Sequence, residues 1–276
     1  MSTRTRLGVR WTMGDVDPRG FEALRLSIQG AWRLFGPAAD YAVCVNTLPV
    51  SVVRAHVGPT PMPVRWIQAD GQLPAWLRAR FDDGLGEGMA WKFAPVRAFP
   101  DKHELSLDND CILWGIPHAL LAWLEGVRPS FLVAEDVRAC FGQFSSLCGD
   151  APRNLGIRGL PPGFDLEMAL QRLLADFPEP LSSELDEQGM QLAALYQNGP
   201  VHVVRVDDVT ICSPFFPHHQ HLGRCGAHFV GLNARELPWR YYDRPATACV
   251  DEHWRGHFPE LRRRVVLPDE EALTSI

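Results

Sequence analysis

The residues best suited to chemistry are two aspartates that follow a short segment of alternating polarity. Apolar and polar residues alternate through His103–Leu107, the period of a half-buried strand, and Asp108, Asn109 and Asp110 follow directly. A spacing of two residues can aim the Asp108 and Asp110 carboxylates at one divalent cation, and such a cation can hold a diphosphate. Asp and Asn are also common turn formers, so the stretch by itself is more readily interpreted as a turn, and it is the neighbouring motifs that favour a cation site.

Two cationic residues lie in the apolar segment just before this strand. Lys92 and Arg97 are five positions apart among apolar neighbours. An unpaired charge is costly in such surroundings, so each side chain needs an anion. The anion could be Asp101 or Glu104 in an ion pair, or it could be a phosphate or one of the carboxylates that follow.

A group of histidines occurs late in the chain. His218, His219, His221 and His228 lie close to Cys225, and these residue types can bind zinc. The segment has no Cys-x-x-Cys pair and has the composition of a loop, so we do not assign it a dedicated zinc site.

The elements that must position these side chains begin with a strand, a helix and a second strand. We expect a strand at Leu7–Met13, a helix at Phe21–Phe35 and a buried strand at Tyr41–Val45. This order is typical of a parallel sheet, in which ligand-binding groups gather at the carboxyl ends of the strands. Thr12 and Asp15 lie at such an end, where they could contact a nucleotide or simply cap a loop.

The same patterns predict further elements along the chain. The segment from Ser182 reads as the capped start of a helix. The other expected elements are strands at Val64–Ile67 and Pro129–Ala134, helices at Ala75–Phe81, Pro117–Leu124 and Phe164–Phe177, and a hairpin formed by Val201–Val206 and Val209–Cys212.

Composition limits the class of protein. The 276 residues are 46% hydrophobic and 22% charged, which suits a globular protein with a full core, here interpreted as one domain over 1–276 with 241–276 as a C-terminal extension. The net charge of −6 offers no basic field, so we expect no nucleic-acid partner. The sequence has no transmembrane run and no signal-peptide pattern, and its seven cysteines form no Cys-x-x-Cys pair, so a cytoplasmic protein with reduced thiols is expected.

Several motifs in a fixed order resemble those of GT-A glycosyltransferases, and in particular glycosyltransferase family eight. They cover the chain from the first strand to Trp239. In order, they are Trp91-Lys92 with Leu107-Asp108-Asn109-Asp110, then Arg153-Asn154-Leu155-Gly156, then Leu185-Asp186-Glu187-Gln188, and finally His228-Phe229-Val230-Gly231 with Leu237-Pro238-Trp239.

This resemblance implies an α/β fold with a GT-A-like, Rossmann-like mixed sheet flanked by helices. It implies that Asp108, Asp110 and His228 hold Mn²⁺ or Mg²⁺, with two oxygen ligands and one nitrogen. Two further sets of expected site residues combine what the resemblance implies with the strand ends and the buried cations described above. The expected contacts to a nucleotide-sugar donor, UDP-linked by analogy, are Thr12, Asp15, Lys92, Arg97, Asn109, Asn154 and Gly231. The expected catalytic residues facing the sugar are Asp186, Glu187 and Gln188, which could instead form a helix start capped by Ser182 or Ser183.

The chain departs from the family pattern at several positions. Leu237 stands where the family has a Lys that contacts the donor phosphate, and the interval from Gly231 to Pro238 is two residues longer. Leu155 replaces a small residue, and Glu187-Gln188 replaces Gln-Asp. These changes put the phosphate contact in doubt, with Arg235 or Arg240 as substitutes.

The expected function is therefore a metal-dependent glycosyltransferase, of hexosyltransferase type, that transfers a sugar to a carbohydrate or other hydroxyl acceptor. One alternative is a sugar-nucleotidyltransferase, but that class has a Gly-rich loop after its first strand, and Met13–Arg19 is poor in glycine. The other alternative is a nucleotide-sugar-binding protein without turnover, which the changes at Leu237 and Glu187 would fit.

Overall fold

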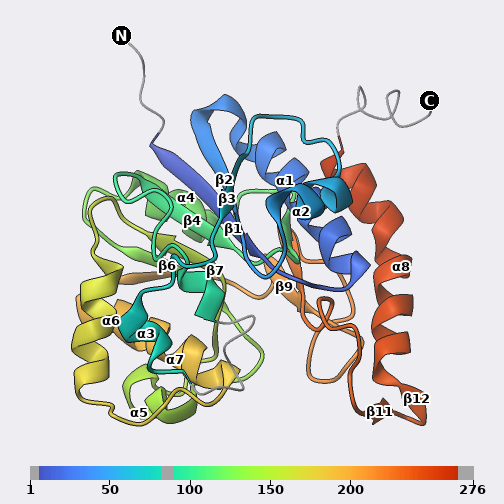
Figure 1. Ribbon diagram of the computed structural model, residues 1–276. Coiled ribbons are helices and arrows are strands. Elements are labelled where there is room, and N and C mark those ends of the chain that lie inside the picture. Colours follow the sequence, from blue (N-terminus) through green and yellow to red (C-terminus); the bar gives the residue numbers. More distant parts are fainter. Residues whose placement is uncertain (1–5, 82–89, 267–276) are drawn as a thin grey trace.

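A seven-stranded sheet organises the part of the chain that the computed structural model describes, residues 6–81 and 90–266 (Figure 1). β7 is antiparallel to both of its neighbours, whereas all other neighbouring strands are parallel. This arrangement confirms the predicted α/β class with a mixed sheet. Across the sheet the strands are β3 (Arg65–Gln68), β2 (Ala39–Val45), β1 (Leu7–Met13), β4 (His103–Leu107), β7 (Arg153–Leu160), β6 (Phe131–Glu135) and β8 (Val201–Val204).

One hydrophobic core joins three helices to the sheet. Alternate residues of β1, including Val9 and Trp11, are fully buried in it. The Trp11 ring also donates a hydrogen bond of 2.8 Å from Nε1 to Ser27 Oγ. Burying each such side chain contributes about 1.5–3 kcal/mol. The helices of this core are α1 (Pro18–Phe35), α2 (Val50–Val57) and α4 (His118–Glu125).

A second hydrophobic core packs four further helices against the sheet. Phe131 and Val133 of β6 are buried in it, together with apolar residues of the helices. Fully buried charges also lie within the sheet, where Arg10 Nη1 is 3.7 Å from Glu104 Oε1. The helices are α3 (Ala75–Arg78), α5 (Ser145–Cys148), α6 (Leu166–Ala175) and α7 (Glu184–Asn198).

A smaller three-stranded sheet lies beside the large one. Its central strand, β10 (Gly226–Phe229), is antiparallel to β5 (Cys111–Leu113) and parallel to β9 (Val209–Cys212). The long helix α8 (Ala246–Val265) packs against this sheet and α1 through a third core, which contains Trp254 (Figure 1). A short pair of strands, β11 (Arg240–Tyr241) and β12 (Arg244–Pro245), precedes α8.

Most expected elements are present, but the predicted hairpin is wrong. β8 pairs in parallel with β6 in the large sheet, whereas β9 pairs with β10 in the small one. A turn closed by hydrogen bonds to the Arg205 carbonyl does separate the two strands, but the strands do not pair with each other. Beyond the turn, the Asp208 carbonyl accepts hydrogen bonds from the main-chain N–H groups of Cys225 and Gly226, at 2.7 and 3.0 Å.

The described part of the predicted C-terminal extension is dominated by α8, whose last turn carries the basic run Arg262–Arg264. Residues 267–276 of that extension lie outside the described residues. None of the helices that the structure describes combines the length and the apolar composition needed to cross a membrane.

Candidate metal centre

The three predicted metal ligands, Asp108, Asp110 and His228, lie close together in the structure. His228 Nε2 lies 3.3 Å from Asp110 Oδ1 and 3.7 Å from Asp108 Oδ2. One ligand atom of each residue lies within 4.8 Å of the other two. Asp110 and His228 are buried, whereas the Asp108 side chain is 25% exposed and keeps the cluster open to solvent.

Strand pairing explains why residues so distant in sequence meet. Asp108 and Asp110 lie in the tight connection from β4 to β5, closed by a hydrogen bond of 2.9 Å from Cys111 N–H to the Asp108 carbonyl. Antiparallel pairing of β5 with β10 places Cys111 opposite His228. The N–H of Phe229 then donates to the Asp110 carbonyl at 3.0 Å, which fixes the imidazole beside both carboxylates.

Lys92 supplies a positive charge at this cluster. Its Nζ is 3.1 Å from Asp108 Oδ1 and 4.0 Å from Glu187 Oε2. Burial lowers the pKa of Lys92, but the charges of Asp108 and Glu187 outweigh that effect and raise it above its usual value. Lys92 therefore stays charged, and its predicted proximity to the carboxylates is a feature of the structure.

The titratable groups of the cluster influence one another. Burial alone would raise the pKa of Asp108, but Lys92 and His228 lower it below its usual value. Burial would lower the pKa of His228, but its hydrogen bond to Asp110 and the two carboxylate charges raise it. Burial and the nearby Asp108 raise the pKa of Glu187, which Lys92 only partly opposes. The cluster thus holds more negative charge than Lys92 alone neutralises.

Asn233 is a site residue that sequence reasoning did not find. Its Nδ2 donates to Asp110 Oδ2 at 3.1 Å and to Asn109 Oδ1 at 3.0 Å. Asn109 Nδ2 donates in return to Asn233 Oδ1 at 2.7 Å and to the Gly20 carbonyl at 3.2 Å. Asn109 was predicted to contact the nucleotide-sugar donor. Its side chain instead binds Asn233 and Gly20 and so stabilises the loop that contains Asp108 and Asp110. The only sequence signal for Asn233 was its place two residues after Gly231.

Gly156 allows His228 to occupy its position. A Cβ atom on Gly156 would lie 2.4 Å from His228 Cε1, closer than real Cβ contacts. The Gly156 carbonyl also accepts a hydrogen bond of 2.9 Å from Asp108 N–H. The neighbouring Asn154 uses its side chain locally, accepting from Gly156 N–H at 2.6 Å and donating to Asp136 at 3.0 Å. Asn154 therefore shapes β7 beside the cluster.

The three predicted catalytic residues have different surroundings. Asp186 accepts hydrogen bonds from the main-chain N–H groups of Gln143, Ser182 and Ser183 at 2.9, 2.9 and 3.1 Å, and with Ser183 it forms a capping box at the start of α7. Gln188 donates to the Cys140 carbonyl at 3.0 Å. Glu187 alone of the three has an ion-pair contact with Lys92 at the cluster.

Arg97, which was predicted to contact the donor, is held elsewhere. Its guanidinium donates to the carbonyls of Pro161, Phe164, Phe99 and Lys102 at 2.9 to 3.2 Å. Its Nε is 3.9 Å from Glu104, near the opposite end of β4 from Asp108. The anion that this buried cation needs is therefore Glu104, one of the two ion-pair partners that the sequence offered, and not a phosphate or a carboxylate of the Asp-Asn-Asp segment.

Three other residues predicted to contact the nucleotide-sugar donor lie at or beyond the carboxyl ends of β1 and β10. Thr12 is at the carboxyl end of β1, one position beyond the pairing of Trp11 with Leu107. Asp15 is half exposed and forms an ion pair with Arg235. Gly231 has a φ of +83° in the turn that follows β10, a conformation that favours glycine, and it leads the chain back to Asn233.

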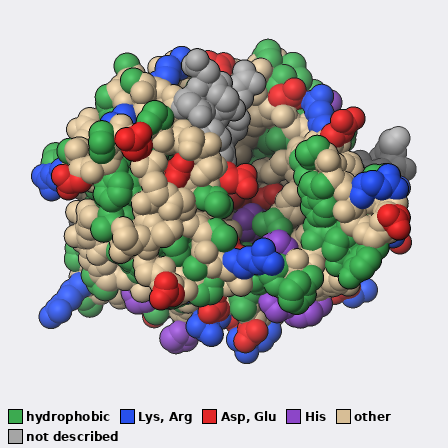
Figure 2. Space-filling view, turned by 90° about the horizontal axis from the view of Figure 1, so that it is seen from below, with side chains coloured by type: hydrophobic (Ala, Val, Ile, Leu, Met, Phe, Trp, Pro, Cys, Tyr) green, Lys and Arg blue, Asp and Glu red, His purple; other side chains and the backbone are tan. Residues whose placement is uncertain are grey.

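The molecule is hollowed on the side where the carboxyl ends of the strands lie. Figure 2 shows this hollow, with acidic and histidine side chains visible inside it. A different cavity, of about 570 Å³, lies at the amino ends of β2 and β3 and is lined mainly by apolar groups such as Trp32, Met62 and Phe99. The Asp108 cluster is the candidate metal centre, because the residues that line the other cavity include no such convergence of ligand groups.

Similar solved structures share this fold. A galactosyltransferase, LgtC, in complex with donor and acceptor sugar analogs, has a TM-score of 0.54 at 12% identity, over 98% of this chain and 100% of that chain. Mouse xyloside xylosyltransferase 1 has a TM-score of 0.52 at 13% identity, over 84% and 99% of the two chains. The glycosyltransferase GlyE of Streptococcus pneumoniae TIGR4 has a TM-score of 0.51 at 13% identity, over 93% and 64%.

Sequence comparisons add nothing to this, since no family model matches the chain and no curated protein matches it. The structural likeness shows that the chain has the GT-A glycosyltransferase fold.

Proposed function

We propose that this protein is a metal-dependent glycosyltransferase that moves a sugar from a nucleotide-sugar donor, UDP-linked, to a hydroxyl group of a carbohydrate or other acceptor. The observation that carries the proposal is the convergence of Asp108, Asp110 and His228. The cluster lies where the Asp-Asn-Asp segment follows β4. This is the side of the sheet formed by the carboxyl ends of the parallel strands, where α/β folds bind their ligands.

The three metal-binding side chains fit a hard divalent cation, one that prefers oxygen ligands. Two carboxylate oxygens and one imidazole nitrogen suit Mn²⁺ or Mg²⁺, and they leave positions for phosphate oxygens and water. Asp108, Asp110 and His228 would be the ligands. When bound, the cation would neutralise the charge that develops on the diphosphate as the bond between sugar and phosphate breaks.

The remaining residues of the cluster would orient the donor. Lys92 brings a permanent positive charge beside Asp108, and it can contribute to binding of the diphosphate. Asn233 and Gly156 fix Asp110 and His228 by a hydrogen bond and by close packing. With these groups held by the fold, the ligands need little rearrangement when the donor binds.

Glu187 is our choice for the residue that faces the transferred sugar. It is 3% exposed and its carboxylate is 4.0 Å from Lys92. A carboxyl group with a raised pKa can exchange hydrogen bonds with sugar hydroxyls, and it can take part in proton transfer at the acceptor. Asp186 and Gln188 would support it indirectly, because their side chains bind main-chain groups of the protein.

The decisive experiment combines ligand binding with turnover. The full chain would be heated with UDP, with UDP-sugars and with other nucleotide sugars, each with and without Mn²⁺, because a ligand that binds the native state raises Tm. Release of UDP from each UDP-sugar would be measured in parallel. A rise in Tm that needs both UDP and Mn²⁺, together with UDP release, is expected. Binding without any release or transfer would show a binding protein instead, and the absence of any nucleotide effect would overturn the proposal.

A further inference from the structure

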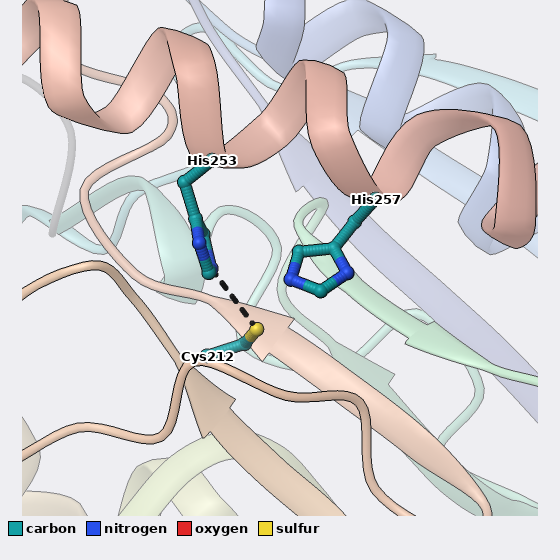
Figure 3. A group of neighbouring side chains, drawn as sticks. All are labelled: Cys212, His253 and His257. Carbon is teal, nitrogen blue, oxygen red and sulfur yellow. Dashed lines mark hydrogen bonds between the residues drawn. The ribbon is translucent and has the colours of Figure 1, made fainter.

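A second group of metal-binding side chains lies away from the Asp108 cluster. Cys212 Sγ, at the end of β9, is 3.3 Å from His253 Nε2 on α8. His257, one turn further along α8, completes a group whose ligand atoms all lie within 4.8 Å of one another. Figure 3 shows both imidazole rings extending from α8 toward Cys212. We propose that these three residues form a zinc site that fastens α8 to the small sheet.

The spacing of the ligands suits this ion. Residues four apart on a helix lie on the same face, so His253 and His257 can serve one ion from a rigid support. In tetrahedral Zn²⁺ coordination, sulfur and nitrogen ligands are separated by about 3.5 Å, given their usual bond lengths to zinc. The separation of 3.3 Å between Cys212 Sγ and His253 Nε2 is close to that value. Structural zinc sites have four ligands, and the Gln220 carbonyl oxygen, 3.0 Å from His257 Nε2, is the nearest candidate for the fourth.

The chemistry of the ligands separates this site from the first one. A thiolate and two imidazoles select zinc over the harder Mg²⁺ and Mn²⁺, which prefer oxygen ligands. A thiol that only donated a hydrogen bond to His253 would explain a single contact. The second imidazole lies beside the first, with ring centroids 4.6 Å apart, and its contact with the Gln220 carbonyl does not involve the thiol.

The surroundings suit a structural ion. Cys212 is 1% exposed, and His253 and His257 are half-buried. The ring of Phe229 lies 6.2 Å from that of His253 and 6.0 Å from that of His257, which shields the group on the sheet side. The Gln220 carbonyl oxygen is 3.0 Å from His257 Nε2 and brings one further oxygen to the edge of the group.

Strand geometry places the two metal groups on opposite faces of the small sheet. In the parallel pair of β9 and β10, Cys212 is in register with Phe229, and Ile211 is in register with His228. Because successive residues of a strand point to opposite faces, Cys212 faces α8 while His228 faces the two aspartates. An ion bound by Cys212, His253 and His257 would therefore hold α8 against β9, the neighbour of the strand that carries His228.

The test uses the full chain after treatment with a chelator. Zn²⁺ and Co²⁺ would each be titrated into the protein, the first in competition with a chromophoric chelator. We expect one tight Zn²⁺ site per chain that excess Mn²⁺ does not displace. Co²⁺ should produce a thiolate-to-metal charge-transfer band and the strong visible bands of tetrahedral coordination. If the wild-type protein gives no such charge-transfer band, or binds no zinc in stoichiometric amount, the proposal is wrong.

Matched variants assign the ligands. Cys212→Ser should remove the charge-transfer band, and His257→Gln should weaken zinc binding at least tenfold. Asp110→Asn should leave both properties unchanged, because it alters the other metal group, and so should His118→Ala, which removes an exposed histidine at the start of α4. A band that persists in Cys212→Ser would overturn the assignment. Should Cys212→Ser not fold, the wild-type Co²⁺ spectrum and His257→Gln still decide the question.

Discussion

Removing the charge of Asp110 should weaken metal-dependent binding without destabilising the fold. Asp110→Asn keeps the size of the side chain and an oxygen that can accept from Asn233, which now donates at 3.1 Å. It removes one anionic ligand, so the affinity for UDP in the presence of Mn²⁺ should fall at least tenfold, about 1.4 kcal/mol, with Tm close to that of the wild type. Isothermal titration with and without Mn²⁺ measures this effect.

Asp150→Asn is the matched control, because Asp150 is exposed and far along the chain from the cluster ligands. It should bind UDP as the wild type does. Equal Mn²⁺-dependent affinity in Asp110→Asn and the wild type would remove Asp110 from the metal site.

Glu187 should affect turnover more than binding. Glu187→Gln retains the hydrogen-bonded contact with Gln191 but loses the ability to ionise. We expect kcat to fall at least about a hundredfold while UDP affinity changes little, because the residue is proposed to face the sugar and not the diphosphate. The comparison variant is Glu184→Gln, in the same first turn of α7 but exposed. Equal losses of kcat in the two variants, or an unchanged kcat in Glu187→Gln, would move the sugar contact to another residue.

Gly156 should be intolerant of even one methyl group. In Gly156→Ala the new Cβ would lie 2.4 Å from His228 Cε1, so the imidazole must shift. We expect a stability loss of about 1–3 kcal/mol and weaker Mn²⁺-dependent binding of UDP. Denaturant unfolding and titration measure the two effects. Gly256→Ala in α8, where a Cβ meets open space, should keep binding and lose no stability. Wild-type binding by Gly156→Ala would mean that His228 does not need its present position.

At this scale the sequence could predict which residues form the candidate metal centre, but it could not predict the residues that support them. The spacing of Asp108 and Asp110 is a local feature, and it proved sufficient to place both near one point. The contact of Asn233 with Asp110 depends on a loop far along the chain. For Arg97 the sequence predicted that the cation needs an anion, because its neighbours are apolar. It could not predict which anion, and in the structure that anion is Glu104.

At the scale of the elements, Asp186 should act through the start of α7. Its two carboxylate oxygens accept from three main-chain N–H groups, at Gln143, Ser182 and Ser183. In Asp186→Asn one oxygen becomes a donor that faces N–H groups, so the free energy of unfolding should fall by about 1–3 kcal/mol. Denaturant unfolding measures this. Loss of transfer with unchanged stability would instead support a direct catalytic role for Asp186.

The same contacts predict an acid-sensitive part of the stability. Burial would raise the pKa of Asp186, but the N–H groups of Gln143 and Ser182 outweigh it, so the pKa is lowered in the folded protein. The stabilisation is complete above the ordinary pKa of 3.8 and is lost as the pH falls below that value. The stability difference between the wild type and Asp186→Ala should therefore shrink as the pH falls below 3.8, and a difference that stays constant there would contradict the mechanism.

Strand partners were harder to predict than the strands themselves. The alternating and apolar runs at Leu7–Met13 and Val209–Cys212 fold as strands. The wrong hairpin arose because a two-residue Asp207-Asp208 turn favours local pairing, whereas the main-chain groups at Asp208 bind Cys225 and Gly226 in the small sheet. Pairing of this kind is decided by tertiary contacts, which no local pattern contains.

At the scale of the whole molecule, the site joins two sheets. Asp108 and Asp110 follow a strand of the large sheet, whereas His228 belongs to the small one. A ligand held by all three should therefore protect both sheets together. We expect UDP with Mn²⁺ to slow amide hydrogen exchange in 103–107 of the large sheet and in 226–229 of the small sheet to a similar degree, as measured by mass spectrometry. Protection confined to one of these segments would mean that the ligand does not bridge the sheets, and Asp110→Asn serves as the control that should lose the effect.

The contact between Gly156 and His228 also has a consequence for the history of the sequence. The imidazole fills the space that any side chain at position 156 would need. The two positions should therefore change together: a lineage that keeps the histidine must keep the glycine, and a larger residue can enter position 156 only after a smaller one has replaced the histidine. Distant relatives that have lost turnover should be recognisable by that paired replacement.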